Sequence, residues 1–319
     1  MSNLFSNIEA RTRLAGTNKL EILLFTLGFD ARTGRKETFG INVFKVREVM
    51  RTPEITAAPE MPDCVEGMVS LRGTLVPVVD LAKYVGIASD TPRGIMIVTE
   101  YNGHTQGFLV EAVDTILRLD WSQMRVPPEM LTAKMGGLVT AITELEDGRL
   151  VMMLDVEKVL AETARYDETM LYSGIEPVDD ERIVVFADDS AVARGQIEKT
   201  LHVLGVGYIG AINGRRAIEE LQKIAAHAQS TGRSVRELVS VILTDVEMPE
   251  MDGYILTKMI KSDSRFAGIP VVMHSSLSGM SNQTLGKSVG VDEYVSKFEP
   301  QRLAATLRRM IAESRPGRK

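Results

Sequence analysis

Short apolar runs separated by turn residues fill the first half of the chain. Between residues 19 and 123 these runs are rich in Val, Ile, Leu and Phe and are bounded by Gly, Asn, Asp or Pro. Such runs predict β-strands, which here read LEILLFTLG, TFGINVF, GTLVPVVDL, GIMIVTEYNG and QGFLVEAVDTILRL. Strands that follow one another this closely, joined by tight turns, predict a barrel or a sandwich.

A repeat within this half indicates two similar subdomains. LVPVVDLAKYV (75–85) and LVMMLDVEKVL (150–160) align at an offset of 75 residues. Each is an apolar strand that ends at an aspartate, Asp80 or Asp155, and is followed by a short helical pattern. We expect each aspartate to be the N-cap of its helix.

The second half has a different period. Continuous apolar runs alternate with amphipathic patterns, such as Ile197, Leu201 and Leu204 at i, i+4 and i+7. Five strands alternating with five helices predict a doubly wound α/β domain with a parallel sheet. The polar segment before it predicts a linker. We therefore expect an N-terminal segment (1–18), a β-rich domain (19–165), a linker (166–181), an α/β domain (182–312) and a tail (313–319).

Composition and charge narrow the functional classes. The chain has 44% hydrophobic and 25% charged residues, which is typical of a globular protein. A net charge of −6 provides no general attraction to nucleic acid or acidic lipid. The single cysteine, Cys64, the lack of a secretory signal and the lack of a long apolar run predict a cytoplasmic protein without direct membrane insertion.

Chemically active side chains follow the strands of the predicted parallel sheet. Asp188 and Asp189 follow the first strand and Asp245 the third, while Ser275 and Lys297 end the fourth and fifth. Ligands of such sheets bind at this edge. Carboxylates that crowd together repel, so either one is protonated or turned to solvent, or a hard cation such as Mg²⁺ joins them. Asp245 ends the central strand, so we expect it to be the nucleophile in phosphoryl transfer.

These strand ends resemble a known family. VVFADDSAVAR, VILTDVEMPEMDGY, IPVVMHSS and DEYVSK match, in order, the receiver domains of two-component response regulators over about 182–311. The resemblance implies that Asp189, Asp245 and the backbone carbonyl of Glu247 hold Mg²⁺, with Asp188 assisting through water.

The same resemblance assigns the remaining roles. Asp245 is the implied phosphorylation site, Ser275 the switch hydroxyl, Tyr294 the switch aromatic residue and Lys297 the phosphate contact. Two positions depart from the family pattern. Phe298 replaces the usual cis-proline after the lysine, so we expect a trans peptide there. Glu247 adds a carboxylate beyond the acceptor, which predicts slow hydrolysis of the phosphoryl group.

The first half resembles the CheW family of chemotaxis coupling proteins. FGINVFKVREVM (39–50) and VEGMVSLRGTLVPVVDL (65–81) carry the resemblance, which implies a pair of SH3-like β-barrels. It also implies that Val46, Gly67 and Arg72 fall on surfaces that contact a receptor tip or a histidine kinase. The residues themselves leave alternatives open: Gly67 as a turn glycine with positive φ, and Arg72 as a support of a turn through a salt bridge.

A CheW-like domain joined to a receiver domain resembles the CheV family. That resemblance implies a cytoplasmic adaptor, recruited to membrane chemoreceptor arrays, that couples methyl-accepting chemoreceptors to the CheA histidine kinase. Phosphorylation of Asp245 would regulate it, and a phosphatase is a further expected partner. The implied protein is a phosphoacceptor, not an enzyme, apart from self-phosphorylation by small donors and auto-dephosphorylation.

Two other functions stay open at this point. One is a phosphate sink that drains CheA without altering coupling. The other is an Asp-nucleophile phosphohydrolase of the haloacid dehalogenase type, which would need an Asp-x-Asp pair where this chain has Asp245-Val246-Glu247.

Overall fold

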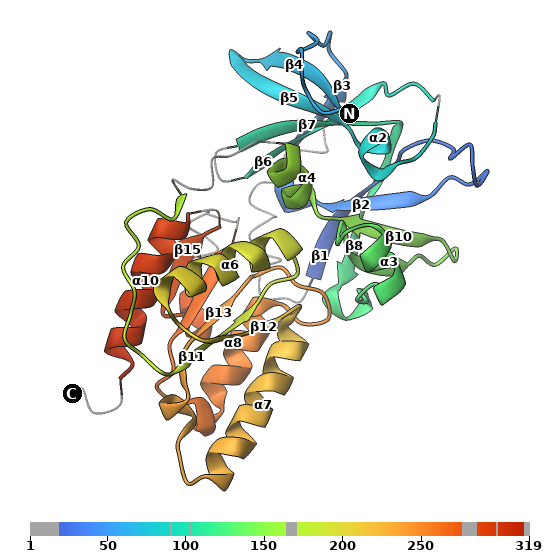
Figure 1. Cartoon of the computed structure of the whole chain (residues 1–319). Coiled ribbons are helices and arrows are strands. Elements are labelled where there is room, and N and C mark those ends of the chain that lie inside the picture. Colours follow the sequence, from blue (N-terminus) through green and yellow to red (C-terminus); the bar gives the residue numbers. More distant parts are fainter. Residues whose placement is uncertain are drawn as a thin grey trace. The chain divides into compact units, whose positions relative to one another are not determined.

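The structure is a computed structural model of the chain and describes residues 19–89, 91–101, 104–163, 171–275, 286–297 and 299–315. Two compact units divide these residues, one holding 19–163 and the other 171–315 (Figure 1). Among the described helices, none combines the length and the apolar character needed to cross a membrane. Each unit is described by itself below.

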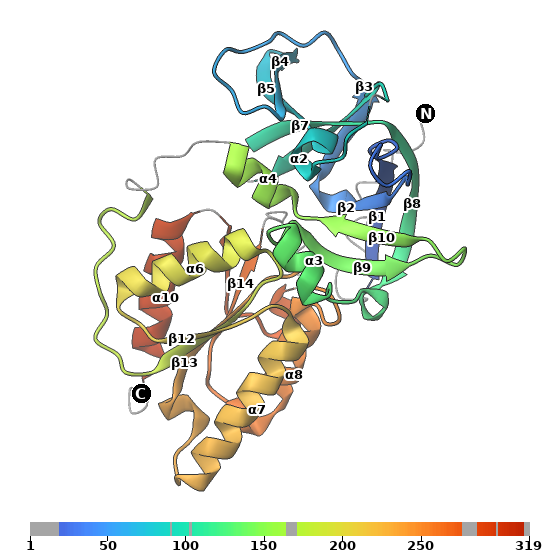
Figure 2. The ribbon, with the colours of Figure 1, turned by 45° about the vertical axis from the view of Figure 1, so that its right-hand side comes forward.

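The first unit is built on two five-stranded sheets. One has the strand order β8-β1-β2-β10-β9 and the other β3-β6-β7-β5-β4. Figure 2 shows β2, β10 and β9 following one another across the first sheet. The strands are β1 (Lys19–Thr26), β2 (Thr38–Asn42), β3 (Val46–Arg51), β4 (Val65–Leu71), β5 (Thr74–Asp80), β6 (Ile95–Tyr101), β7 (His104–Val110), β8 (Ala112–Asp120), β9 (Val139–Glu144) and β10 (Leu150–Leu154). The helices are η1 (Val43–Lys45), α2 (Leu81–Val85), η2 (Trp121–Gln123), α3 (Glu129–Lys134) and α4 (Val156–Thr163).

Each of these sheets has an apolar cluster of its own. Leu20, Ile22 and Leu24 alternate along β1 and point into the cluster of the first sheet, together with Trp121. The second sheet packs a separate cluster that includes Val78. Every second side chain of β1 thus points to the same face of the sheet, as the period of two requires. The prediction of an all-β first domain with two subdomains is confirmed.

The repeated aspartates act as helix caps. The carboxylate of Asp80 accepts the N–H of Lys83 at 3.1 Å. The carboxylate of Asp155 accepts the N–H groups of Glu157 and Lys158 at 3.0 and 3.2 Å. Because Asp80 ends β5 and Asp155 follows β10, each sheet contains one copy of the repeated strand–cap–helix unit. The predicted caps are confirmed.

One predicted strand is in fact two. QGFLVEAVDTILRL breaks at Glu111, and β7 then belongs to one sheet while β8 belongs to the other. The carboxylate of Glu111 accepts the Thr26 hydroxyl at 2.7 Å and pairs with the Lys36 ammonium at 2.6 Å. These contacts fix the chain where it passes between sheets. The apolar pattern is continuous across this point, so it does not predict the break, and it also does not predict β3, β4 or β9.

The second unit is a five-stranded, all-parallel sheet with the order β12-β11-β13-β14-β15. Its strands are β11 (Ile183–Ala187), β12 (Tyr208–Ala211), β13 (Val239–Thr244), β14 (Val271–Ser275) and β15 (Glu293–Ser296). Its helices are α6 (Ala191–Leu204), α7 (Gly214–Ser230), η3 (Val235–Glu237), α8 (Gly253–Ser262), η4 (Ser264–Phe266) and α10 (Pro300–Glu313). The predicted doubly wound sheet is confirmed.

Helices cover both faces of this sheet. Residues of α7 and α8 form one buried cluster with the strands, and residues of α6 and α10 form another (Figure 1). All six residues of the central strand β13 are buried. A strand covered on both faces reads as a continuous apolar run. Because the strands are parallel, their carboxyl ends share one edge, and the polar residues that follow them meet there.

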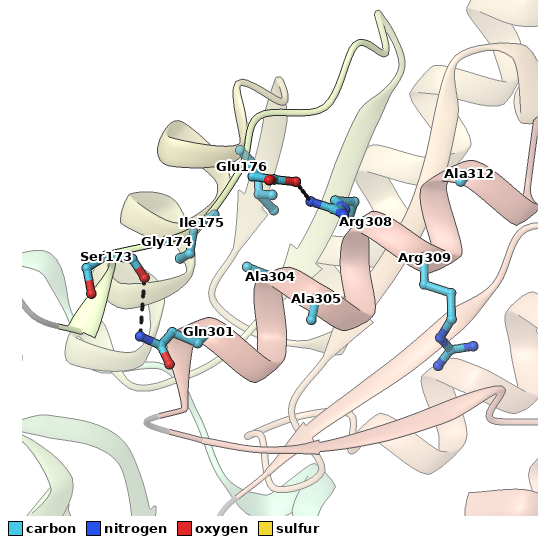
Figure 3. Close-up of a pocket in the computed structure, with 11 residues that line it drawn as sticks. Ser173, Gly174, Ile175, Glu176, Gln301, Ala304, Ala305, Arg308, Arg309 and Ala312 are labelled. Carbon is cyan, nitrogen blue, oxygen red and sulfur yellow. Dashed lines mark hydrogen bonds and ion pairs between the residues drawn. The ribbon is translucent and has the colours of Figure 1, made fainter.

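The described part of the predicted linker, residues 171–181, packs on the second unit, and we call it the docked segment. The Val178 N–H donates to the Leu204 carbonyl at 2.8 Å, and Gln301 Nε2 donates to the Ser173 carbonyl at 3.3 Å. Figure 3 shows this segment beside α10, where the two line a cavity of about 580 Å³.

Ion pairs also hold the docked segment, both within α10 and just beyond its C-terminal end. Arg308 of the helix pairs with Glu176. Asp180 accepts hydrogen bonds from Arg182 and Arg315. Burial would raise the pKa of Asp180, but these hydrogen bonds outweigh it and hold the pKa below its ordinary value.

Candidate functional site

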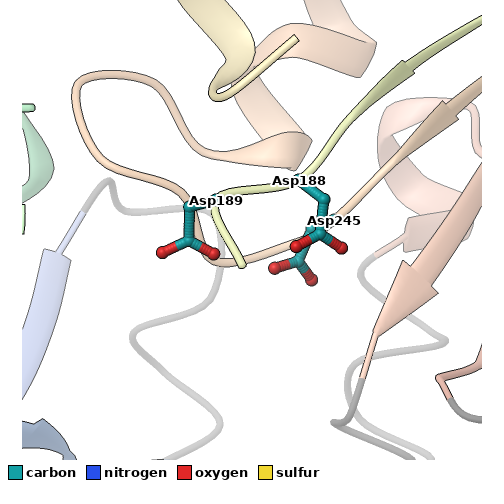
Figure 4. A group of neighbouring side chains, drawn as sticks. All are labelled: Asp188, Asp189 and Asp245. Carbon is teal, nitrogen blue, oxygen red and sulfur yellow. The ribbon is translucent and has the colours of Figure 1, made fainter. Parts of the chain in front are cut away.

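Three carboxylates meet at the carboxyl edge of the parallel sheet. Asp188 and Asp189 follow β11, and Asp245 follows β13. One oxygen from each of the three lies within 4.8 Å of the others (Figure 4). Asp188 is 0% exposed and Asp245 4%. The Asp245 N–H donates to the Ala187 carbonyl at 2.8 Å, so the ends of β11 and β13 are tied together.

The ammonium group of Lys297 reaches into this cluster. Lys297 follows β15, and its Nζ lies 2.9 Å from Asp188 Oδ2 and 3.0 Å from Asp245 Oδ2. It is 2% exposed, so it is not a solvated lysine at a strand tip. The Lys297 charge offsets only part of the charge of the three carboxylates, so the cluster stays electronegative, in surroundings where charges interact more strongly than in water.

The loop after β13 explains the acid-rich sequence VILTDVEMPEMDG. The Val246 N–H donates to Asp245 Oδ1 at 2.7 Å and orients the carboxylate. Asp252 instead caps α8 by accepting the Ile255 N–H at 2.7 Å. A Cβ at Gly253 would lie 2.0 Å from the Asp245 carbonyl oxygen, so this position requires glycine. Of the acids in this loop, Asp245 lies in the cluster, while Asp252 has a structural role.

Ser275 and Tyr294 lie together beside the cluster. Ser275 ends β14, is buried and accepts the Lys297 N–H at 3.2 Å through its carbonyl oxygen. Tyr294 of β15 packs against Val246 and Met273. Burial raises the pKa of the Tyr294 phenol, and a hydrogen bond with the Ser275 side chain opposes that rise. The hydroxyl, the phenol and the ammonium thus already face inward.

The donor set fits a divalent cation. Carboxylate oxygens are the ligands that Mg²⁺ prefers, and three of them converge here with one lysine to balance them. Asp188, Asp189 and Asp245 would hold the cation, which would offset negative charge on a phosphoryl group during transfer. The part of Glu247 in that set stays a prediction, and the peptide bond to Phe298 lies outside the described residues.

The residues of the first unit that are predicted to contact partners all belong to the sheet β3-β6-β7-β5-β4 or its turns. Arg72 and Gly73 form the turn between β4 and β5, with φ values of +51° and +85°. Two central residues with positive φ are typical of a type I′ hairpin turn. The Arg72 side chain is 74% exposed, and its Nη2 lies 3.0 Å from Glu48 Oε2 on β3. Arg72 is therefore both accessible and ion-paired.

Gly67 and Val46 are less accessible. Gly67 has a φ of +139°, and a Cβ there would lie 2.1 Å from the Thr56 carbonyl oxygen, so the fold itself requires glycine. Val46 is 3% exposed, so a partner would meet the neighbouring Arg47 and Glu48 of β3 instead of the Val46 side chain. The contact roles of Gly67 and Val46 stay predictions.

Arg194 is a residue near the acids that the sequence pattern does not single out. It lies in the first turn of α6, and its Nη1 donates to the carbonyl oxygens of Asp188 and Asp189, both at 2.9 Å. The first turn of a helix favours acidic residues, so an arginine there, directly after an acidic strand end, is unusual. That position is the signal by which the sequence could have pointed to Arg194.

Comparisons with protein families agree with both units. The CheW-like domain family matches residues 22–164, and the response regulator receiver domain family matches residues 184–308.

Two relatives align over most of this chain and a third over part of it. Chemotaxis protein CheV3 of Helicobacter pylori is 30% identical over 279 residues, which are 86% of this chain and 88% of CheV3. Chemotaxis protein CheV1 of the same organism is 27% identical and aligns over 98% of this chain and 99% of its own. Chemotaxis protein CheY1 of that organism is 34% identical over 125 residues, 39% of this chain and 92% of CheY1. The chain therefore belongs to the CheV family of chemotaxis proteins, with a CheW-like domain followed by a receiver domain.

Proposed function

We propose that this protein is an adaptor that couples chemoreceptors to the CheA histidine kinase, and that a phosphoryl group on Asp245 regulates the coupling. The observation that carries the proposal is the presence, in one chain, of a CheW-like unit and a receiver unit with an electronegative cluster around Asp245. The receiver supplies the chemistry, and the CheW-like unit supplies the contacts with partners.

The chemical step is a transfer between two nucleophiles. A carboxylate oxygen of Asp245 attacks the phosphorus of a phosphohistidine on the kinase. The P–N bond breaks, the imidazole nitrogen keeps the electron pair, and Asp245 becomes an acyl phosphate. Lys297 Nζ, 3.0 Å from Asp245 Oδ2, is placed to contact the phosphoryl oxygens. The Ser275 hydroxyl can hydrogen-bond the same group.

The new charge changes the partners of these side chains. A phosphoryl group carries about −1.5 to −2 charges at neutral pH and competes with Asp188 for Lys297. Because Tyr294 is hydrogen-bonded to Ser275, drawing the hydroxyl toward the phosphoryl group changes the support of Tyr294 on β15. A coupling free energy of roughly 1–3 kcal/mol between Asp245 and the partner surface is typical of such switches.

The test supplies the purified full-length protein with Mg²⁺ and acetyl phosphate and measures its binding to receptor signalling domains and CheA. Binding to both partners that changes on phosphorylation supports the proposal. Phosphorylation that leaves binding unchanged favours the phosphate sink. Release of phosphate from small phosphomonoesters in many turnovers would indicate the phosphohydrolase.

Reversing the charge of Arg72 is expected to weaken partner binding. Arg72 is exposed at the hairpin tip, where a glutamate would also face Glu48 across the present ion pair. Interface arginines often contribute more than 1 kcal/mol, so Arg72→Glu should raise the Kd for receptor or kinase roughly 5- to 30-fold. Phosphoryl uptake by Asp245 should be unaffected. Surface plasmon resonance and a parallel phosphorylation assay measure the two properties.

Arg118→Glu is the matched control. Arg118 is also exposed on the first unit, and its Nη2 lies 2.6 Å from Glu21 Oε1. Both residues belong to the first sheet, whereas Arg72 belongs to the second. Its replacement removes a comparable surface pair at a different place. Equal weakening by both variants would mean that net charge, not the Arg72 position, determines binding.

Removing the carboxylate of Glu247 is expected to shorten the life of the phosphoryl group. Its negative charge adds to the effect of burial in raising the pKa of the Tyr254 and Tyr294 phenols, so it acts on the surroundings of Asp245. A side chain that hinders the attacking water by about 1 kcal/mol slows hydrolysis by roughly a factor of five. The phosphoryl group on Asp245 should therefore be hydrolysed several-fold faster in Glu247→Ala than in the wild type. Loss of radiolabelled phosphate after removal of the donor measures the rate.

Glu250→Gln serves as the control in the same loop. Glu250 lies 3.5 Å from Arg215 and has a φ of +66°, so the isosteric glutamine removes the charge with the least disturbance. The Glu250 variant should keep the wild-type hydrolysis rate. An unchanged rate in Glu247→Ala contradicts the prediction.

A further inference from the structure

The acidic loop Asp188–Ser190 is held from two sides. Within the loop, the Ser190 N–H donates to Asp188 Oδ1 at 2.9 Å, and the Ser190 side chain caps α6 through the Ala193 N–H. From outside the loop, Arg194 Nη1 donates to the Asp188 and Asp189 carbonyl oxygens, each at 2.9 Å. The guanidinium therefore contacts the backbone of the loop.

These two carbonyls belong to the peptide groups on either side of the Asp189 Cα. A peptide group is planar, so only φ and ψ of Asp189 connect the two planes. One guanidinium nitrogen that binds both oxygens limits those two angles together. The angles at the Cα in turn set the direction of the Cα–Cβ bond. Arg194 thereby restricts the direction in which the Asp189 side chain leaves the backbone.

Asp189 is the member of the cluster whose backbone Arg194 holds on both sides of the Cα. Asp188 and Asp245 are held by the Lys297 ammonium at 2.9 and 3.0 Å, and both are buried. Asp189 is only partly buried. The backbone of a loop residue samples several conformations unless it is fixed, and the Cα–Cβ bond moves with it.

We propose that Arg194 is a positioning residue for the divalent cation site, acting through the backbone of Asp189. The inference rests on the proposed function, because it assumes that the cluster binds a cation. Two effects of Arg194 have opposite signs here. As a nearby positive charge it opposes cation binding, so its loss alone would tighten the site. As a support of the loop it favours binding, so its loss lowers the affinity for the cation.

The test measures the Mg²⁺ affinity of the full chain by isothermal titration calorimetry. Residues that orient metal ligands typically contribute 10- to 100-fold in affinity, so we expect Arg194→Met to weaken Mg²⁺ binding by roughly that factor. Phosphoryl uptake from acetyl phosphate should need correspondingly more Mg²⁺ but reach the wild-type rate when Mg²⁺ saturates. Unchanged or tighter Mg²⁺ binding overturns the proposal, as does a lower rate at saturation with normal Mg²⁺ affinity.

Two further variants separate positioning from folding and charge. Arg194→Lys keeps the charge and a donor, so it should recover part of the affinity; Arg194→Lys as weak as Arg194→Met would contradict the backbone role. Arg233→Met is the control, since Arg233 also donates to a carbonyl oxygen, that of Glu237 at 3.0 Å, and should leave Mg²⁺ affinity unchanged. A wild-type chain that binds no Mg²⁺ would refute the proposed function instead.

Discussion

Asp245→Asn is expected to abolish phosphoryl uptake from both CheA and acetyl phosphate. The carboxamide is not nucleophilic, and it removes one of the three carboxylates that converge at the cluster. The loss should be complete within the sensitivity of radiolabelling or intact-protein mass spectrometry. The variant should still fold, because losing one of three crowded carboxylates relieves repulsion around Lys297.

Asp252→Asn provides a demanding control for this result. Asp252 lies in the same loop and is buried, but its carboxylate caps α8. Asparagine is an equally good N-cap, so the variant should fold and take up phosphate normally. Wild-type uptake in Asp245→Asn would mean that the acceptor is another residue, and the receiver chemistry proposed for this chain would then be wrong.

Lys297→Met is expected to destabilise the second unit strongly when no divalent cation is present. The lysine is the partner of Asp188 and Asp245 at 2.9 and 3.0 Å, and all three side chains are buried. Removing one side of a buried ion pair leaves charges without compensation and typically costs about 3–5 kcal/mol. Urea denaturation followed by far-ultraviolet circular dichroism, to which the helices of this unit contribute most, measures the free energy of unfolding.

Mg²⁺ and a second substitution sharpen this prediction. A cation that binds the folded unit at one hundred times its Kd restores about 2.7 kcal/mol, so Mg²⁺ should recover much of the lost stability. Asp245→Asn combined with Lys297→Met should be more stable than Lys297→Met alone, because the two groups interact directly. Lys223→Met, which removes an exposed ion pair with Glu220, should change stability by less than about 0.5 kcal/mol. Equal losses from both lysines would contradict the buried-charge argument.

The strand ends were the part of the site that the sequence could predict. A parallel sheet brings the residues after each strand to one edge, so the order of the strands alone places Asp188, Asp245 and Lys297 together. Which acid pairs with the lysine depends on side-chain geometry and is not encoded in the spacing. Arg194 escaped the sequence argument for a similar reason, since an arginine on the polar side of an amphipathic helix has no periodic signal of its function.

The CheW-like unit was predictable to a smaller extent. The capping aspartates Asp80 and Asp155 are local features, and local features are visible in a sequence. The break at Glu111 depends on Thr26 and Lys36, which lie far away in the chain. The burial of Val46 is another tertiary effect, because β3 has an irregular register against β6 between Val46 and Glu48. Such an irregularity shifts the alternation of inward and outward residues.

Trp121 provides a built-in spectroscopic probe. It is the one tryptophan of the sequence, and its indole is buried in the cluster of the first sheet with Leu20 and Met124. The phosphoryl acceptor belongs to the other unit. Tryptophan emission therefore reports on the CheW-like unit alone. A change in that emission when Asp245 is phosphorylated would show, without any attached dye, that the signal has passed from the receiver to the coupling unit.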